Sequence, residues 1–151
     1  MKGSMSASTP PSDAEMFRLA NDLRIACQRI ARRVRMESTI GVAPHQFTVL
    51  TRVHNEGPQT PTHLAAGERV SLPSMTRTVN YLVEQGYALR MPHPDDRRQV
   101  LVHLTDAGED LILQTIAQRD SWMRAHIEGL DDEQLRLLRQ AADLLLEVSG
   151  V

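Results

Sequence analysis

Two short segments of this 151-residue chain carry arginine beside other polar side chains. The first, residues 71–85, combines Arg77 with five hydroxyl side chains: Ser71, Ser74, Thr76, Thr78 and Tyr81. The second is the run Asp96-Arg97-Arg98. Guanidinium and hydroxyl groups donate hydrogen bonds to phosphate oxygens and to the edges of bases. Both segments therefore have the chemistry of a nucleic-acid contact.

Residues 71–85 are predicted to form a helix with one apolar face. Ser71 is a good N-cap residue, and Pro73 suits the first turn of a helix. The apolar residues follow the spacing of a buried stripe: Met75, Val79 and Leu82. The opposite face carries hydroxyls and Arg77, so we expect Arg77 to contact a guanine edge. A phosphate is expected at the helix N-terminus, near Ser71 and Ser74. The alternative is that Arg77 is a solvated surface charge.

The second segment lies in a turn between two predicted strands, residues 87–91 and 99–104. Prolines and aspartates crowd this turn, and apolar residues alternate along the second strand. An arginine on a rigid hairpin can enter a narrow minor groove, where the negative potential is enhanced. We expect Arg97 and Arg98 to contact DNA in this way, and Asp96 to orient a neighbouring arginine by a salt bridge.

The remaining periodicity predicts a mainly helical chain with one small β-hairpin, which is the pattern of a winged helix-turn-helix. The other helices are expected over residues 14–37 (capped by Asp13), 44–56, a short stretch after Thr60 and Pro61, a stretch from the cap Thr105 to about 128, and 132–148 (capped by Asp131). The long terminal helices carry broad apolar faces, so we expect them to pack together and against a second copy of the chain. A closed monomeric bundle is the alternative.

Composition limits the classes of function that remain. Residues 1–104 hold thirteen basic and nine acidic side chains, whereas residues 105–151 hold four and ten, and the whole chain has a net charge of −2. This balance disfavours indiscriminate coating of nucleic acid. Five aromatic residues are too few for a single-strand stacking platform. A membrane helix needs an apolar run of about 18 residues, and none is present, so we expect a cytoplasmic protein.

Several stretches of the chain resemble the MarR family of transcriptional regulators. The likeness extends over about residues 14–148 and is carried by Leu64-Ala65, by Val70–Arg77, by Leu82–Tyr87 and by Asp96–Gly108. The run D-R-R-x-x-x-V-x-L-T-x-x-G in the last of these is the most specific. The third helix contains Gly67, a weak helix former. We expect this glycine to make the third helix short or mobile.

The resemblance implies a homodimer that binds double-stranded DNA at a short inverted repeat, usually to repress nearby genes. It implies a dimerisation region (13–40 and 105–151) and a DNA-binding winged helix-turn-helix (41–104). Residues 1–12 are rich in Ser, Pro and Thr and lack periodicity, so we expect them to form a flexible tail. Arg77 would lie in the major groove, Arg97 or Arg98 in the minor groove, and Asp96 would have a structural role. Thr60 and Thr62 are further candidate phosphate contacts. Many members of this family release DNA when a small phenolic or aromatic acid binds, so a small-molecule effector is a candidate partner.

The sequence gives less support to control of DNA binding by oxidation of a cysteine or by binding of zinc. Cys27 lies on the apolar stripe of the first helix, so we expect an inert buried thiol. The six histidines include no pair at i, i+3 or i, i+4, which disfavours zinc. We therefore expect no metal and no cofactor. Arginines of the first helix can pair with a carboxylate effector or form a solvated face, and the residues that bind an effector are not assigned.

Two other classes of function are alternatives to a DNA-binding regulator. A winged helix can also bind a protein partner, and that alternative remains open because a fold does not determine a function. An enzyme is not expected, because the chain has no nucleophile elbow, phosphate loop or metal-ligand spacing. The one acid–base-like cluster, His93 with Asp95 and Asp96, lies on an exposed turn.

Overall fold

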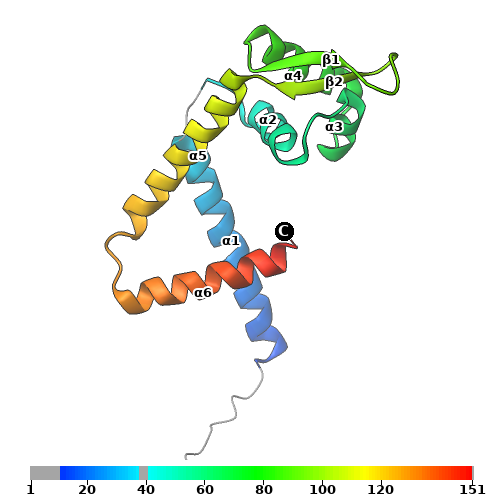
Figure 1. The fold of residues 1–151 in the computed structure, drawn as a ribbon. Helices are drawn as coiled ribbons and strands as arrows, with labels where there is room; N and C mark the ends of the chain where they lie inside the picture. Colours follow the sequence, from blue (N-terminus) through cyan, green and yellow to red (C-terminus); the bar gives the residue numbers. More distant parts are fainter. Residues whose placement is uncertain (1–10, 38–40, 151) are drawn as a thin grey trace, which may run out of the picture.

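The computed structural model describes residues 11–37 and 41–150, and its elements follow the order predicted from the sequence (Figure 1). They are α1 (Asp13–Glu37), α2 (Pro44–Glu56), α3 (Pro61–Gly67), α4 (Leu72–Glu84), β1 (Ala88–Pro92), β2 (Val100–Leu104), α5 (Asp106–Ile127) and α6 (Asp132–Ser149). The fold is mainly helical with one antiparallel hairpin, as expected for a winged helix-turn-helix. The strands are displaced slightly from the prediction: Tyr87 and Gln99 lie outside them, and Pro92 ends β1.

The part of the chain from residue 41 to residue 104, here called the winged-helix domain, contains most of the core, and Leu111 and Ile112 of α5 complete it. Its largest fully buried side chains come from α2, α3, α4 and β2: Val49, Leu50, Leu64, Met75, Val79, Leu82 and Val102. The predicted inner stripe of α4 is thus confirmed. A closely packed core of this kind resists rearrangement, so it gives α4 a rigid base.

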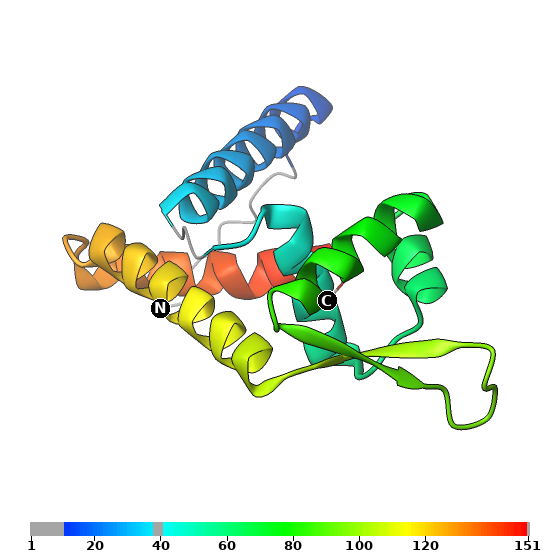
Figure 2. The same ribbon diagram turned by 90° about the horizontal axis from the view of Figure 1, so that it is seen from above.

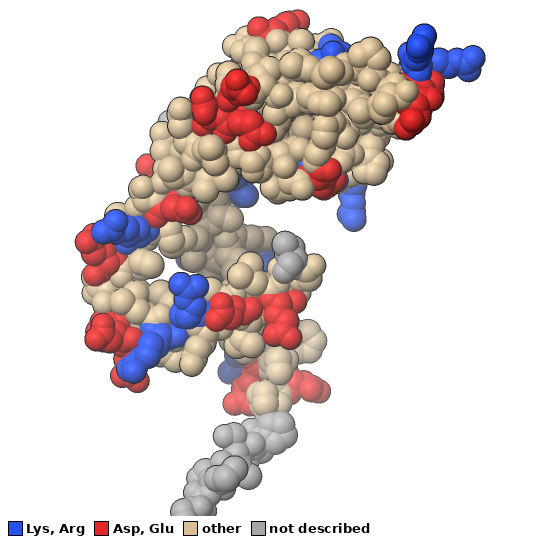
Figure 3. Space-filling view, viewed as in Figure 1, with Lys and Arg blue, Asp and Glu red and all other residues tan. Residues whose placement is uncertain are grey.

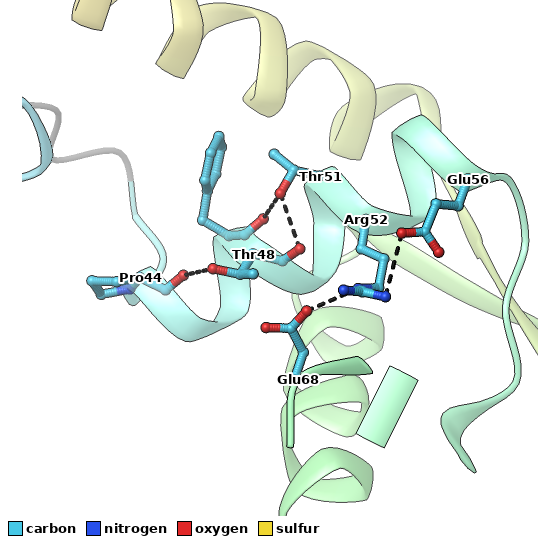
Figure 4. A network of polar contacts seen from close by, with 7 residues as sticks. Pro44, Thr48, Thr51, Arg52, Glu56 and Glu68 are labelled. Atoms are coloured by element: carbon cyan, nitrogen blue, oxygen red, sulfur yellow. Dashed lines mark hydrogen bonds and ion pairs between the residues drawn. The ribbon is translucent and has the colours of Figure 1, made fainter. Parts of the chain in front are cut away.

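An arginine network joins α2 to the end of α3 (Figure 4). The Arg52 Nε atom lies 2.8 Å from a Glu68 carboxylate oxygen, and its Nη1 atom lies 3.3 Å from Glu56. The guanidinium passes directly over Gly67, where a Cβ atom would approach the Arg52 Nη1 atom to 2.3 Å. The sequence alone indicates that Gly67 weakens the helix, and the structure shows that the missing side chain makes room for the arginine.

The hairpin is held at one end by main-chain bonds and at the other by a threonine side chain. Gln59, between α2 and α3, exchanges two backbone hydrogen bonds with Val102 of β2. At the other end, Thr105 caps α5 by accepting from the Gly108 N–H, and its hydroxyl donates to the Gly86 carbonyl at 2.6 Å. One threonine therefore links the end of α4, the hairpin and the start of α5.

The long helices extend away from the winged-helix domain (Figures 1 and 2). In the described chain, neither α1 nor α6 contains a buried residue, and large apolar side chains on both are exposed: Phe17, Leu19, Ile30, Leu137, Leu144 and Val148 are examples. A groove of about 1140 Å³ lies among α1, α5 and α6, with apolar walls that include Ile30, Leu138 and Leu145.

Two expectations for α1 were wrong. Ser12, not Asp13, caps the helix: its main-chain N–H donates to the Glu15 carboxylate, and the Glu15 N–H donates weakly to its hydroxyl. Cys27 is exposed and lines the groove, because α6 does not cover this face of α1 within one chain. Most of the expected flexible tail, residues 1–10, lies outside the described residues.

Candidate nucleic-acid interface

The outer face of α4 lies between two hollows. One, of about 530 Å³, lies on the side of α2 and is lined in part by Ser74, Arg77 and Thr78. The other, of about 510 Å³, lies on the side of the hairpin and is lined in part by Thr76. The predicted residues of α4 therefore form two sets, one on each flank of the helix.

Arg77 is exposed on α4, where its Nη2 atom donates to the Ser74 hydroxyl at 3.3 Å. The other guanidinium N–H groups retain their donor capacity. No ion pair joins Arg77 to an acid of the described chain. This arrangement suits a bidentate contact with an acceptor outside the protein.

Tyr81 and Glu84 make the second half of α4 poorer in free hydrogen-bond donors than the sequence suggested. Tyr81 is half-buried against the core, and its hydroxyl donates to the Gly41 carbonyl at 3.4 Å. Glu84 is exposed two turns after Arg77 and is absent from the predicted set. The donor-rich part of α4 is therefore its first two turns.

The N-terminus of α4 is largely satisfied by its own residues. The Ser74 N–H donates to the Ser71 hydroxyl at 3.4 Å, and the Ser71 hydroxyl donates to that of Ser74 at 3.1 Å. Pro73 has no N–H group to offer. The capping expected from Ser71 is confirmed, but it leaves fewer main-chain donors for a phosphate than the sequence suggested.

Charged side chains gather at the tip of the wing, the hairpin turn that carries Arg97 and Arg98 (Figure 3). Asp96 fixes this turn, with one carboxylate oxygen accepting from the Arg98 main-chain N–H at 3.0 Å and the other from the Gln99 amide at 2.9 Å. These two bonds, the Gln99 bond foremost, hold the pKa of Asp96 below its usual range. The salt bridge expected between Asp96 and a neighbouring arginine is absent from the described residues. Asp96 shapes the main chain instead.

The hollow on the hairpin side brings together residues that are distant in the sequence. It joins Thr60 and Thr62 of the α3 start with Thr76 of α4 and Arg98 of the wing. Thr60 also caps α3, where its hydroxyl accepts from the His63 N–H at 3.1 Å.

Asn80 and Arg90 line the same hollow and are not among the residues predicted from the sequence. Asn80 is exposed on α4, outside the outer face that the sequence indicated. Arg90 lies two residues after the buried Ala88, so both side chains are on the same face of β1. Nothing local in the sequence indicates that Arg90 contacts α4.

A separate cleft of about 490 Å³ lies where α1, α2 and α5 meet. Arg35 and Arg119 line it, and the Arg119 guanidinium carbon lies 4.5 Å from the centre of the Phe47 ring. Burial lowers the pKa of Arg119, and the positive charge of Arg35 adds to this effect. The cleft thus combines cationic groups with an aromatic wall.

Membrane-spanning and metal-binding features are absent from the described residues. No helix there is long and apolar enough to cross a membrane. No group of three or more His, Cys, Asp or Glu side chains there is placed to hold a metal ion.

Comparisons with known proteins agree with this geometry. Residues 42–100, nearly the whole winged-helix domain, match the model of the MarR family. The HTH-type transcriptional regulator ML2140 of Mycobacterium leprae is 41% identical over 132 residues, which cover 87% of this chain and 92% of the relative.

Solved structures share the fold over a similar length. RV1404 of Mycobacterium tuberculosis has a TM-score of 0.78 at 25% identity, with 89% of this chain and 94% of that chain covered. A MarR family protein from Bacillus stearothermophilus has a TM-score of 0.78 at 20% identity, with coverage of 93% and 99%. On the strength of the family match and the close relative, this chain belongs to the MarR family of winged helix-turn-helix, DNA-binding transcriptional regulators.

Proposed function

We propose that the chain is a cytoplasmic homodimeric repressor, without catalytic activity, that binds an inverted repeat in double-stranded DNA and is released by a small aromatic or phenolic ligand. The observation that carries the DNA contact is the exposed Arg77, which stands without an acidic partner among the described residues on a helix fixed by the core. Because the core holds α4 in place, little main-chain freedom is lost when this donor binds.

In this proposal α4 enters the major groove and the wing lies along the minor groove. Arg77 contacts base edges, and Ser71, Ser74, Thr76 and Thr78 contact phosphate or base edges around it. Arg97 or Arg98 extends into a narrow minor groove from a turn that Asp96 holds in place. Tyr81 has a lesser role, because its hydroxyl already bonds the Gly41 carbonyl.

The proposed dimer rests on the apolar surface that one chain leaves exposed. Leu19, Leu137 and Leu144 are each more than half exposed, on helices that carry no buried residue in the described chain. Soluble monomers rarely expose apolar patches of this extent. A second copy that covers these helices also places two α4 helices on one duplex, as an inverted repeat requires.

The proposed ligand site is the cleft between α1, α2 and α5. Arg35 and Arg119 suit the carboxylate of an aromatic acid, and Arg119 lies over the buried ring of Phe47. The cleft lies between the long helices α1 and α5 and helix α2 of the winged-helix domain. A ligand bound there changes how this domain sits on the long helices, and so changes the spacing of the two α4 helices in a dimer.

The test is to select bound fragments from sheared genomic DNA with purified protein and to footprint the enriched site. We expect a pseudo-palindrome with half-sites about one helical turn apart. Adding benzoate or a phenol to the complex should release the DNA, and a reporter placed behind the site should be repressed by the protein. Absence of any enriched sequence favours instead the protein-binding winged helix.

A further inference from the structure

The hollow between the start of α3, helix α4 and the hairpin has the donors of an anion site. Its walls carry three hydroxyl side chains, those of Thr60, Thr62 and Thr76, and two guanidinium groups, those of Arg90 and Arg98. No acidic side chain is among the described residues that line it. The local charge is therefore positive although the whole chain has a net charge of −2.

Arg90 is held in this hollow by a contact between elements. Its Nη2 atom donates to the Asn80 Oδ1 atom at 2.5 Å, which links β1 to α4. In the hairpin, Arg90 pairs with the buried Val102, so its main chain is anchored at the core. Asn80 is a neutral partner, so it orients the guanidinium without cancelling the charge. The remaining N–H groups of Arg90 keep their donor capacity.

Arg98 reaches the same hollow from the hairpin turn that precedes β2. Its main-chain N–H is fixed by Asp96, and the neighbouring Gln99 side chain is fixed by the same carboxylate. One cation on β1 and one in the hairpin turn thus reach the same hollow.

We propose that this hollow binds one phosphate group of the DNA backbone, with Arg90 as its principal donor and Asn80 as the residue that positions Arg90. The inference rests on the proposed function and deepens it. A phosphate held at this point fixes the spacing between α4 in one groove and the wing in the next. The contact is independent of sequence, since it touches no base.

The experiment measures the affinity of four variants for the selected operator and for a mismatched duplex, over a range of salt concentrations. Arg90→Gln should weaken binding to both duplexes by the same factor, about tenfold. It should also make the slope of log affinity against log salt shallower by about 0.9 for each phosphate that the protein no longer neutralises. Arg90→Lys should keep the slope. Asn80→Ala should weaken binding by less than Arg90→Gln and also keep the slope, because the charge remains.

Arg124→Gln is the matched control, since Arg124 is an exposed arginine near the end of α5 that does not line the hollow. It should leave affinity and slope unchanged, and thermal unfolding should show that each variant is folded. An unchanged slope for Arg90→Gln overturns the phosphate site, as does an effect confined to one base position. If the wild-type protein binds the operator and the mismatched duplex equally well, the proposed function fails. That result differs from the two results that overturn only the phosphate site.

Discussion

Arg77 is the side chain on which sequence recognition depends most. It is exposed on the rigid helix α4, and its hydrogen bond to Ser74 leaves most of its donors available. We predict that Arg77→Ala lowers specific affinity by about 1–3 kcal/mol and relaxes the preference at one base position of each half-site. Competition binding against operators mutated one base pair at a time measures this. An unchanged preference at every position contradicts a base contact by Arg77.

Asp96 has a different role, and the pH dependence of the wing should reveal it. Its pKa is lowered by hydrogen bonds that only the charged carboxylate accepts well. Its contribution to the turn is therefore present above the unfolded pKa of about 3.9 and is lost as the pH falls through the lower folded value. The Arg98 amide resonance should be constant from neutral pH down to about pH 5 and should titrate with a midpoint below about 3.9. A midpoint above that value contradicts the hydrogen bonds seen at the turn.

The same residue supports a prediction on binding. Asp96→Asn keeps the shape of the side chain but weakens both bonds, so DNA affinity should fall while the thermal unfolding temperature stays nearly constant, because the turn is exposed. Binding and unfolding measured on the same preparation separate the two effects. A variant with wild-type affinity implies that the turn does not need this carboxylate.

At the scale of the elements, the hairpin packs closely against the start of α5. A Cβ atom at Gly108 would lie 2.1 Å from the Tyr87 carbonyl oxygen, which is main chain and cannot move aside cheaply. We predict that Gly108→Ala destabilises the protein by about 1–3 kcal/mol. Chemical denaturation measures the change.

Gly129 provides the control for this prediction. It lies between α5 and α6, and a Cβ atom there meets nothing within 4 Å. Gly129→Ala should change stability by no more than about 0.5 kcal/mol. Equal effects of the two substitutions contradict a steric role for Gly108.

The elements themselves were predictable because their signals are local. Apolar periodicity, the caps Ser71, Thr105 and Asp131, and the breakers between helices lie within a few residues of the structure they specify. The recognition-helix stripe and the wing were predicted for the same reason.

Contacts between elements were not predictable in this way. The Asn80–Arg90 bond depends on how the hairpin rests on α4, and the Asp96 bonds depend on the path of the turn. The exposure of Cys27 depends on where α6 runs. Each requires the relative placement of parts that no short pattern encodes.

At the scale of the whole molecule, the groove among α1, α5 and α6 should be where the chain is covered by a second copy. We predict that Leu138→Glu, which places a charge on the wall of this groove, converts a dimer into a monomer, because an unpaired buried charge costs several kcal/mol. Sedimentation velocity measures the mass. The control is Gln140→Glu, at an exposed position of α6 that does not line the groove. A wild-type protein that sediments as one chain contradicts the dimer.

The net charge of −2 is compatible with DNA binding because the charges are unevenly placed. The two last helices carry most of the acidic excess, and two of the acids in the winged-helix domain, Glu56 and Glu68, are engaged by Arg52. Such a molecule has only a small positive surface, so its affinity should depend strongly on a matched sequence.

The most direct test of the account is to compare the affinity of the wild-type protein for the intact selected operator with its affinity for the same duplex with one half-site scrambled. Both are measured by fluorescence anisotropy at one physiological salt concentration. A symmetric dimer with two reading helices predicts that scrambling one half-site weakens binding at least about a hundredfold, since each mismatched base pair costs about 1–3 kcal/mol. Equal affinity for the two duplexes would contradict sequence-specific binding by two copies of α4.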